Sequence, residues 1–282
     1  MRPAPRATVG SMTPASTWPE TRTDSAPTPA TPSPFPPPAV TDEQAADLRA
    51  DLTAAGWGVE AVAALLGEAA DAALRREIRL PALRAVRAVL AEGTDSAPSW
   101  SVAVLTALFM LGEPVPATAL DAVLPRTGVS GARRIGLVGE PDEAGRVRAR
   151  VDLRPHEAVD DAGEVRWWVA SDLGGLVTGR VLAPDHVLGI GGAGLTLAVL
   201  TPRTPVRTAL DLGCGCGIQT LYLLRHADRV TATDVSERAL AFTAFNAALA
   251  GISADVDAST DADAPADVDT DGSSGAAVGT AR

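Results

Sequence analysis

The chain has 282 residues, enough for about two ordinary domains, and 46% of them are hydrophobic, so it can bury a core. Its formal net charge is −11, but residues 253–282 contain seven Asp and a single Arg and so carry more than half of that charge. The acidity therefore says little about the folded part. No apolar run reaches the ~18 residues of a membrane span, and the N-terminus has no apolar signal core. These features predict a soluble, cytoplasmic protein with no membrane partner.

Both ends of the chain are biased in composition. Residues 1–40 are rich in Pro, Thr, Ser and Ala. The prolines remove backbone N–H groups that a helix needs, and the segment has little apolar surface to bury. We expect a disordered tail there, with a proline-motif ligand at 36–38 as the less favoured alternative. Residues 253–282 are mostly Asp, Ala, Ser, Thr and Gly, and we expect an acidic, low-complexity, disordered tail.

A small helical module is predicted at 41–92. Thr41 and Gln44 have the spacing of a capping box, which satisfies the first backbone donors of a helix. Apolar residues three and four positions apart then favour three helices. They are expected from Asp42 to Ala55, from Val59 to Leu74 and from Pro81 to Ala91.

A winged-helix-like substrate-recognition domain is predicted at 98–171. A charged and apolar alternation at 146–154 and an apolar run at 165–170 favour a two-stranded ribbon. Helices followed by such a ribbon have the outline of a winged helix. Helices are expected at 100–111 and 117–124, and residues 128–138 are expected to start a third helix that runs into a strand.

Six arginines lie within residues 133–154 of this predicted domain. A guanidinium group can hold a phosphate with two hydrogen bonds, so an RNA-binding surface is one interpretation and an ordinary solvated strand face is the other. Nearby acids, including Glu140 and Asp152, dilute the positive charge. The six are Arg133, Arg134, Arg146, Arg148, Arg150 and Arg154.

Trp167 and Trp168 are neighbours on a predicted strand and so point to opposite faces. At most one can enter the local core. We expect the other to pack on the neighbouring domain rather than to stack on a base.

The most informative stretch is Thr208–Asp234, which reads TALDLGCGCGIQTLYLLRHADRVTATD. A short apolar run ends at Asp211, glycines follow at 213, 215 and 217, a helical pattern comes next, and a second strand ends at Asp234. Glycines between a strand and a helix let a ligand approach the backbone, and an acid after the second strand can accept hydrogen bonds from a ribose. The stretch predicts a nucleoside site. Ile218 and Thr220 stand where G-x-G-x-x-G needs its third glycine, so the NAD and FAD pattern fails.

A carboxylate ahead of the glycines would repel a pyrophosphate but suits a ligand with an ammonium group. This pattern resembles motif I of the class I S-adenosylmethionine (SAM) methyltransferases over residues 185–252. It is most similar to the "methyltransferase small" group, which includes release-factor glutamine methyltransferases and rRNA and tRNA base methyltransferases. The resemblance implies an α/β fold that begins a Rossmann-like domain at 172–252, SAM as cofactor, and rRNA, tRNA or a translation protein as partner. The SAM-binding residues that it implies are Asp211, Gly213, Gly215, Gly217, Asp234 and Val235.

In the resembling group a loop and a helix before the first strand close over the cofactor, and residues 186–200 match that position. His186 is the histidine near this site, and we expect it to be structural rather than catalytic. Gly213, Gly215 and Gly217 belong to one loop, here called the glycine loop, and Cys214 and Cys216 lie inside it. A C-x-C pair cannot alone supply the four ligands of a structural zinc site, so we interpret both as small side chains in a tight turn rather than as a metal or redox site.

The catalytic part of the pattern is missing. A class I methyltransferase sheet has seven strands, and only two precede the acidic tail. The resembling group holds the acceptor nitrogen with an Asn-Pro-Pro-aromatic motif, and neither Asn-Pro-Pro nor Asp-Pro-Pro occurs in this chain. We therefore expect an incomplete sheet with unknown catalytic residues, from a truncated or interrupted sequence. The alternative is a non-catalytic nucleic-acid-binding module with a remnant cofactor domain.

Overall fold

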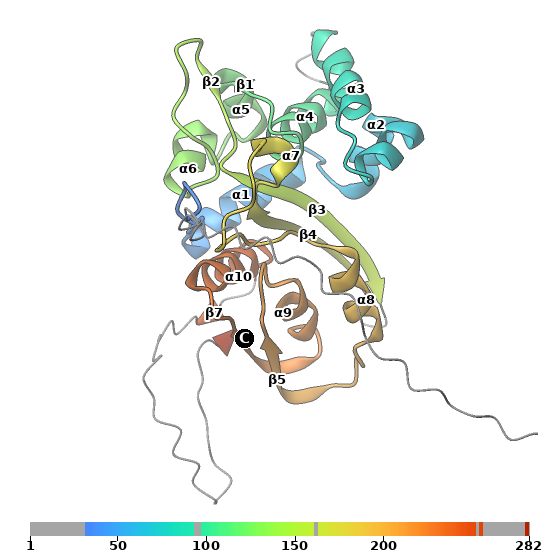
Figure 1. The fold of residues 1–282 in the computed structure, drawn as a ribbon, viewed down its shortest axis with the longest axis vertical. Helices are drawn as coiled ribbons and strands as arrows, with labels where there is room; N and C mark the ends of the chain where they lie inside the picture. The colour runs from blue at the N-terminus through green and yellow to red at the C-terminus, as the bar shows by residue number, and fades with distance from the viewer. Residues whose placement is uncertain (1–31, 93–96, 161–162, 252–253, 256–279, 282) are drawn as a thin grey trace, which may run out of the picture. The chain divides into compact units, whose positions relative to one another are not determined.

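The computed structural model describes residues 32–92, 97–160, 163–251, 254–255 and 280–281 (Figure 1). Residues 1–31 and most of 253–282, for which we expected disorder, lie outside the described residues. Among the described helices, none is long and apolar enough to cross a membrane.

The first three helices form where apolar periodicity predicted them, as α1 (Asp42–Ala54), α2 (Val59–Leu74) and α3 (Leu80–Ala91). The capping box is confirmed, because Gln44 N donates to Thr41 Oγ1 at 3.3 Å and Thr41 N donates to Gln44 Oε1 at 2.9 Å. The three predicted helices are therefore present in the structure.

The buried helix expected at 100–111 consists of two parts. α4 (Pro98–Leu105) continues directly into the π-helical turn η1 (Thr106–Met110). Trp57 packs against this turn, and its Nε1 donates to Thr106 Oγ1 at 3.1 Å while its ring lies 6.0 Å from that of Phe109. The buried indole and hydroxyl thus satisfy each other inside the core.

Two short helices and a small ladder follow. α5 (Ala117–Val123) and α6 (Gly128–Arg134) pack against each other. In the ladder, β1 (Val115–Pro116) pairs antiparallel with β2 (Arg146–Val147). β1 also contacts α5, which follows it directly in the chain.

The ribbon expected at 146–154 and 165–170 differs from the observed strands. Gly139 N donates to Arg148 O at 2.9 Å and Arg150 N donates to Leu137 O at 2.8 Å, so the middle of the alternating segment pairs with the chain before it. One period-two pattern therefore spans two separate strands. For this reason the winged-helix outline is not confirmed in the form in which the sequence predicted it.

A long antiparallel hairpin follows, formed by β3 (Val151–Asp160) and β4 (Gly163–Asp172). Its register places Val151 opposite Asp172 at one end and Asp160 opposite Gly163 at the other. The hairpin packs against η1 and α2 through β3, and against the helix at 237–249 through β4. It therefore joins the helical part to the remainder of the chain.

The two tryptophans of β4 are both buried, which confirms the packing interpretation. Trp168 lies against the helical part, where its Nε1 donates to Trp57 O at 2.8 Å. Trp167 lies on the opposite face, stacked on His156 and edge-on to Tyr222, with ring centroids 6.1 and 5.2 Å away. Each indole therefore packs against a different neighbour of the hairpin.

The glycine stretch folds as a βαβ unit. β5 (Val206–Leu212) and β6 (Ala227–Thr233) are parallel and are joined by α9 (Ile218–Leu223). The sheet order is β5-β6-β8-β7, in which β7 (Ala254–Asp255) and β8 (Thr280–Ala281) have two residues each. Together with the helices, these strands give a mixed α/β structure.

Three more helices complete this part: α7 (Gly175–Thr178), α8 (Gly192–Leu200) and α10 (Glu237–Leu249). Ser236 caps the start of α10, since its Oγ accepts a hydrogen bond from Ala239 N at 3.3 Å.

One face of β5 is open to solvent. Leu210 is 61% exposed and Leu212 82% exposed, whereas Asp211 between them is 7% exposed. Parallel sheets in α/β proteins are normally covered on both faces. Among the described residues, the helices cover only the face of β5 that carries Asp211.

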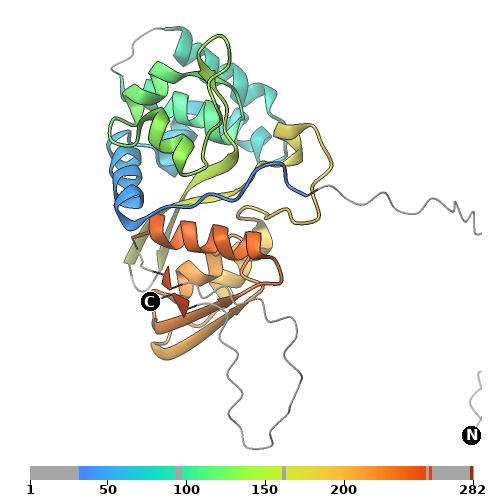
Figure 2. The same ribbon diagram turned by 90° about the vertical axis from the view of Figure 1, so that its left-hand side faces the viewer.

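Residues 32–40 correct the expectation of a disordered tail up to residue 40. This segment runs along α10 (Figure 2), where Arg238 Nη1 donates to Phe35 O at 2.6 Å. Further on, Ala39 N donates to Ile135 O at 3.2 Å. A proline-rich segment has few amides to satisfy, so a few such hydrogen bonds can hold it in an extended conformation.

Asn246 of α10 fixes the glycine stretch to the hairpin. Its side chain is fully buried, and its Oδ1 accepts from Ala170 N at 2.7 Å. Its Nδ2 donates to Ala170 O and to Cys216 O, both at 2.8 Å. One amide side chain thus binds β4 on one side and the glycine loop on the other.

We expect Asn246→Ala to lower the free energy of unfolding by about 2–4 kcal/mol, because it leaves buried backbone groups of Ala170 and Cys216 without partners. Urea denaturation followed by circular dichroism measures this loss. Thr53→Ala is the control, because its hydroxyl only bonds Arg49 O on an exposed helix face. Equal losses for the two variants would contradict the role assigned to Asn246.

Candidate cofactor-binding site

The loop between β5 and α9 needs its glycines for two different reasons. Gly213, Gly215 and Gly217 have φ values of 77°, 58° and 81°, in the left-handed region that other residues rarely adopt. A Cβ on Gly213 or Gly215 would meet no atom within 4 Å, whereas one on Gly217 would lie 2.9 Å from the side chain of Thr243. The first two glycines therefore leave open space above the loop, and the third allows α10 to pack closely.

Backbone hydrogen bonds join the loop to the end of β6. Gly213 N and Cys214 N both donate to Thr233 O, at 2.8 and 2.9 Å. From the other side, Thr243 Oγ1 donates to Gly215 O at 3.1 Å. The loop is therefore held in one conformation from both sides.

Asp234 follows β6 and faces this loop. Its Oδ2 accepts from Gly215 N at 3.0 Å, and its Oδ1 accepts from Ser236 N at 2.9 Å. Each carboxylate oxygen has a second lone pair, so both can still accept a hydroxyl donor. Val235, which was predicted with Asp234, is fully exposed at the same strand end.

Asp211 lies on the inner side of β5. Its Oδ2 accepts from Thr220 Oγ1 at 2.6 Å. Burial raises the pKa of Asp211, the hydrogen bonds from Thr220 oppose this, and the nearby carboxylate of Asp234 adds to it. The structure thus directs this carboxylate toward α9, while Asp234 lies on the open side of the loop.

Cys214 and Cys216 are buried within the loop. Burial raises the pKa of the Cys214 thiol to about 11 and raises that of Cys216 as well. Thr243 Oγ1 lies 3.2 Å from Cys214 Sγ. Both thiols are therefore protonated at neutral pH and behave as small packing side chains.

α8 and the loop before it lie beside the start of α9. Gln219 Nε2 donates to Gly194 O at 2.6 Å, which brings the glycine-rich start of α8 next to the glycine loop. His186 lies away from the loop, with its Nδ1 4.0 Å from Asp172 Oδ2. This contact is consistent with the structural role expected for His186.

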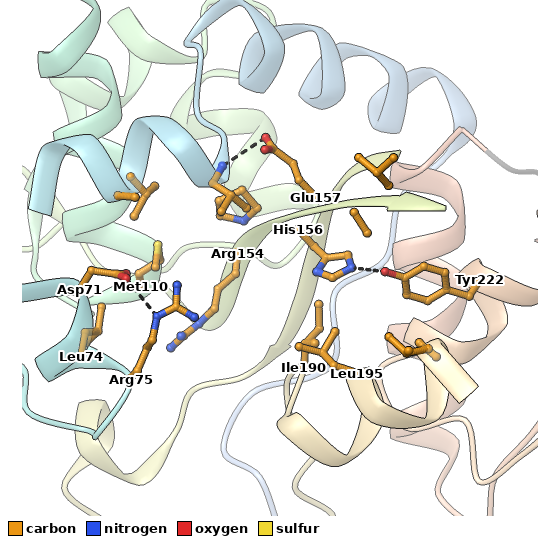
Figure 3. Close-up of a pocket in the computed structure, with 18 of the residues that line it drawn as sticks. Asp71, Leu74, Arg75, Met110, Arg154, His156, Glu157, Ile190, Leu195 and Tyr222 are labelled. Carbon is orange, nitrogen blue, oxygen red and sulfur yellow. Dashed lines mark hydrogen bonds and ion pairs between the residues drawn. The ribbon is translucent and has the colours of Figure 1, made fainter. Parts of the chain in front are cut away.

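A cavity of about 660 Å³ lies between α2, β3, α8 and α9 (Figure 3). In it, His156 Nε2 and Tyr222 Oη share a hydrogen bond of 2.8 Å. Burial lowers the pKa of His156, so the ring is neutral at pH 7. Arg203 lies over the Tyr222 ring, 4.7 Å from its centroid. The cavity therefore has an aromatic wall at His156 and Tyr222, its lining carries three arginines, Arg75, Arg154 and Arg203, and it shares α9 with the glycine loop.

Sequence reasoning did not single out His156, Tyr222 or Arg203. Tyr222 is the only tyrosine of the chain and stands inside the glycine stretch, which is a signal that could have been used. Its partner His156 is 66 residues away, and a single sequence carries no information on such a pair. The same limit applies to the buried ion pair between Asp172 and Arg238.

We expect iodoacetamide to alkylate the two cysteines at least about 100-fold more slowly in the folded protein than in concentrated urea, because burial suppresses the thiolate and shields the sulfur. The chain has only these two cysteines, so the intact mass after labelling near neutral pH reports on the loop alone. Equal rates in the two solvents would show that the loop is open.

Comparison with known proteins identified two family matches. Residues 54–150 match the Domain of unknown function (DUF7059), and residues 191–271 match the Methyltransferase small domain. A search of curated proteins found no match. The second match spans α8, the glycine loop and Asp234, and it supports a class I methyltransferase, a family that typically uses SAM.

Proposed function

We propose that the glycine loop binds SAM and that the chain belongs to a methyltransferase acting on a nitrogen, either of an RNA base or of a translation-factor side chain. The observation that carries the proposal is the pairing of the loop with Asp234, whose carboxylate accepts from Gly215 N at 3.0 Å. A carboxylate beside a backbone that a ligand can approach supports a role for Asp234 as the acceptor of ribose hydroxyls. The family match at 191–271 supports the methyltransferase part of the proposal.

The loop residues fit a nucleoside. A Cβ at Gly213 or Gly215 would occupy otherwise open space, so both positions leave room for a ligand against the backbone. Asp234 retains lone pairs for two hydroxyl donors. The buried and hydrogen-bonded Asp211 supports the loop from beneath through Thr220.

When bound, SAM supplies a methyl group on a positively charged sulfur for in-line displacement by a nitrogen. The protein contributes mainly orientation and exclusion of water in such a transfer. Asp234 would orient the ribose, and α8 would limit solvent access through its contact between Gly194 and Gln219. No residue of this chain is assigned to hold the acceptor, because the sequence lacks the Asn-Pro-Pro motif of the resembling group.

The alternative of a non-catalytic module with a remnant cofactor domain is not favoured. A remnant would be free to lose the geometry of the loop. Here three left-handed glycines, the Asp234 acceptor and the contact with α10 are all in place. These features support a cofactor site that binds its ligand.

We expect Asp234→Ala to weaken SAM binding by at least about tenfold, because it removes charge-assisted hydrogen bonds to the ribose. Isothermal titration calorimetry measures the affinity. Asp228→Ala is the matched control, since Asp228 is an exposed acid at the opposite end of the same strand. An unchanged affinity for Asp234→Ala would refute the assigned role of this carboxylate.

We expect the 282-residue chain to transfer no methyl group by itself, because it contains no motif that presents an acceptor nitrogen. The assay incubates the purified chain with radiolabelled SAM and either cellular RNA or cellular protein. Incorporation above that of the Asp234→Ala variant would overturn this expectation while supporting the cofactor site.

A further inference from the structure

A second site lies on α6, far along the chain from the glycine loop. α5 and α6 are joined by the short turn 124–127, as in helix-turn-helix units. After α6, Val138 and Ala149 form an antiparallel bridge, and the loop between them leads into β2, which pairs back to β1. The elements therefore follow one another as a helix (α4 with η1), a strand (β1), two helices (α5 and α6) and two strand segments joined by a loop, at Val138 and at 146–149. This is the order of elements in a winged helix.

A cavity of about 290 Å³ lies between α6 and these strands. Three of the six arginines of the sequence cluster line this cavity, two from α6 and one, Arg150, from the segment between β2 and β3. The structure separates two others, because Arg146 pairs with Asp142 and Arg154 pairs with Asp152. The lining residues are Ser130, Arg133, Arg134, Val138, Glu140 and Arg150.

The positive charge of this cavity is only partly balanced. Arg133 pairs with Glu140, an exposed ion pair of the kind that contributes little stability. Among the described residues, no carboxylate lies within ion-pair distance of Arg134 or Arg150. Two guanidinium groups are therefore available to an anion.

Arg150 is held in place without its hydrogen-bonding capacity being used. Its guanidinium lies 5.2 Å from the ring centroid of Phe35, and its Nε packs near Gly139, where an added Cβ would be 3.6 Å from it. The Nε is buried and has no hydrogen-bond partner within the described structure. A buried donor of this kind is costly unless a ligand or water satisfies it.

We propose that Ser130, Arg133, Arg134 and Arg150, here called the α6 arginine site, bind phosphodiester groups of a nucleic acid. Arginines hold phosphate oxygens with paired hydrogen bonds, and the second helix of a helix-turn-helix unit is the element that enters a groove. Arg134 and Ser130 lie on the exposed side of α6, while Arg150 lies across the cavity. The site would thus hold a backbone phosphate between the helix and the strand.

This proposal rests on the proposed function. It adds that the methyl acceptor is a nucleic acid rather than a translation protein. Its test needs no cofactor. A failure of SAM binding and a failure of nucleic-acid binding are therefore distinguishable in the same preparation.

The experiment measures fluorescence anisotropy of a labelled RNA hairpin and of a DNA hairpin of the same sequence, each titrated with the full chain at several salt concentrations. We expect Arg134→Gln and Arg150→Gln each to weaken binding about tenfold. Each should also lower the slope of log Kd against log salt by about one, as expected for one lost phosphate contact. The two hairpins show whether the ribose 2′-hydroxyl contributes.

The controls separate charge from folding. Arg150→Lys should retain most of the salt dependence because it keeps the charge. Arg166→Gln should bind like the unchanged protein, since Arg166 pairs with Glu164 away from the site. Arg134 is exposed, so Arg134→Gln should keep the native circular dichroism spectrum and the same SAM affinity.

Three outcomes would overturn the proposal. The first is no binding of either hairpin at low salt. The second is Arg134→Gln and Arg150→Gln both binding within twofold of the unchanged protein. The third is retention of an unmodified release-factor protein, with both hairpins failing to compete for it.

Discussion

Asn246 makes three hydrogen bonds, and the arrangement of the candidate site depends on them. A buried amide is stable only when its donors and acceptors are satisfied, and here the partners are the backbone of β4 and the carbonyl of Cys216. The glycine loop is therefore positioned by a strand that belongs to the preceding hairpin. The βαβ unit does not set its own orientation within the protein.

A buried ion pair adds a second constraint at the other end of α10. Arg238 pairs with Asp172 at the end of β4 and also donates to Phe35 O in the N-terminal segment. Asp172 in turn accepts from Val187 N at 2.9 Å. Breaking such a pair leaves an uncompensated buried charge, so α10, the hairpin and the segment at 32–40 depend on one another. The same segment carries Phe35 to Arg150, which links the packing around α10 to the α6 arginine site.

Local patterns in the sequence predicted the helices and strands well where residues close together in the sequence determine the structure. The capping box at Thr41, the apolar period of α1 to α3 and the strand, glycine loop and helix around Gly213 are all of this kind. The division of the alternating segment at Arg148 was not predictable, because it depends on backbone partners at 137–139. The sequence also did not predict that the Asp211 side chain points inward toward α9. The resemblance to motif I of the methyltransferases placed Asp211 only at the start of the glycine loop. The chain folds back after α6, and this determines which arginines line the cavity there.

The open face of β5 has a consequence for how the protein responds to heat and to ligands. Leu210 and Leu212 leave apolar surface in water that would contribute about 2–4 kcal/mol if it were covered. The β5–α9–β6 unit therefore has less packing to resist local opening than the helical part and the hairpin. Opening of β5 would release the glycine loop while the rest of the chain stays folded. A nucleoside bound to the loop, as proposed above, would oppose this opening, so any surface that covers Leu210 and Leu212 would also strengthen that binding.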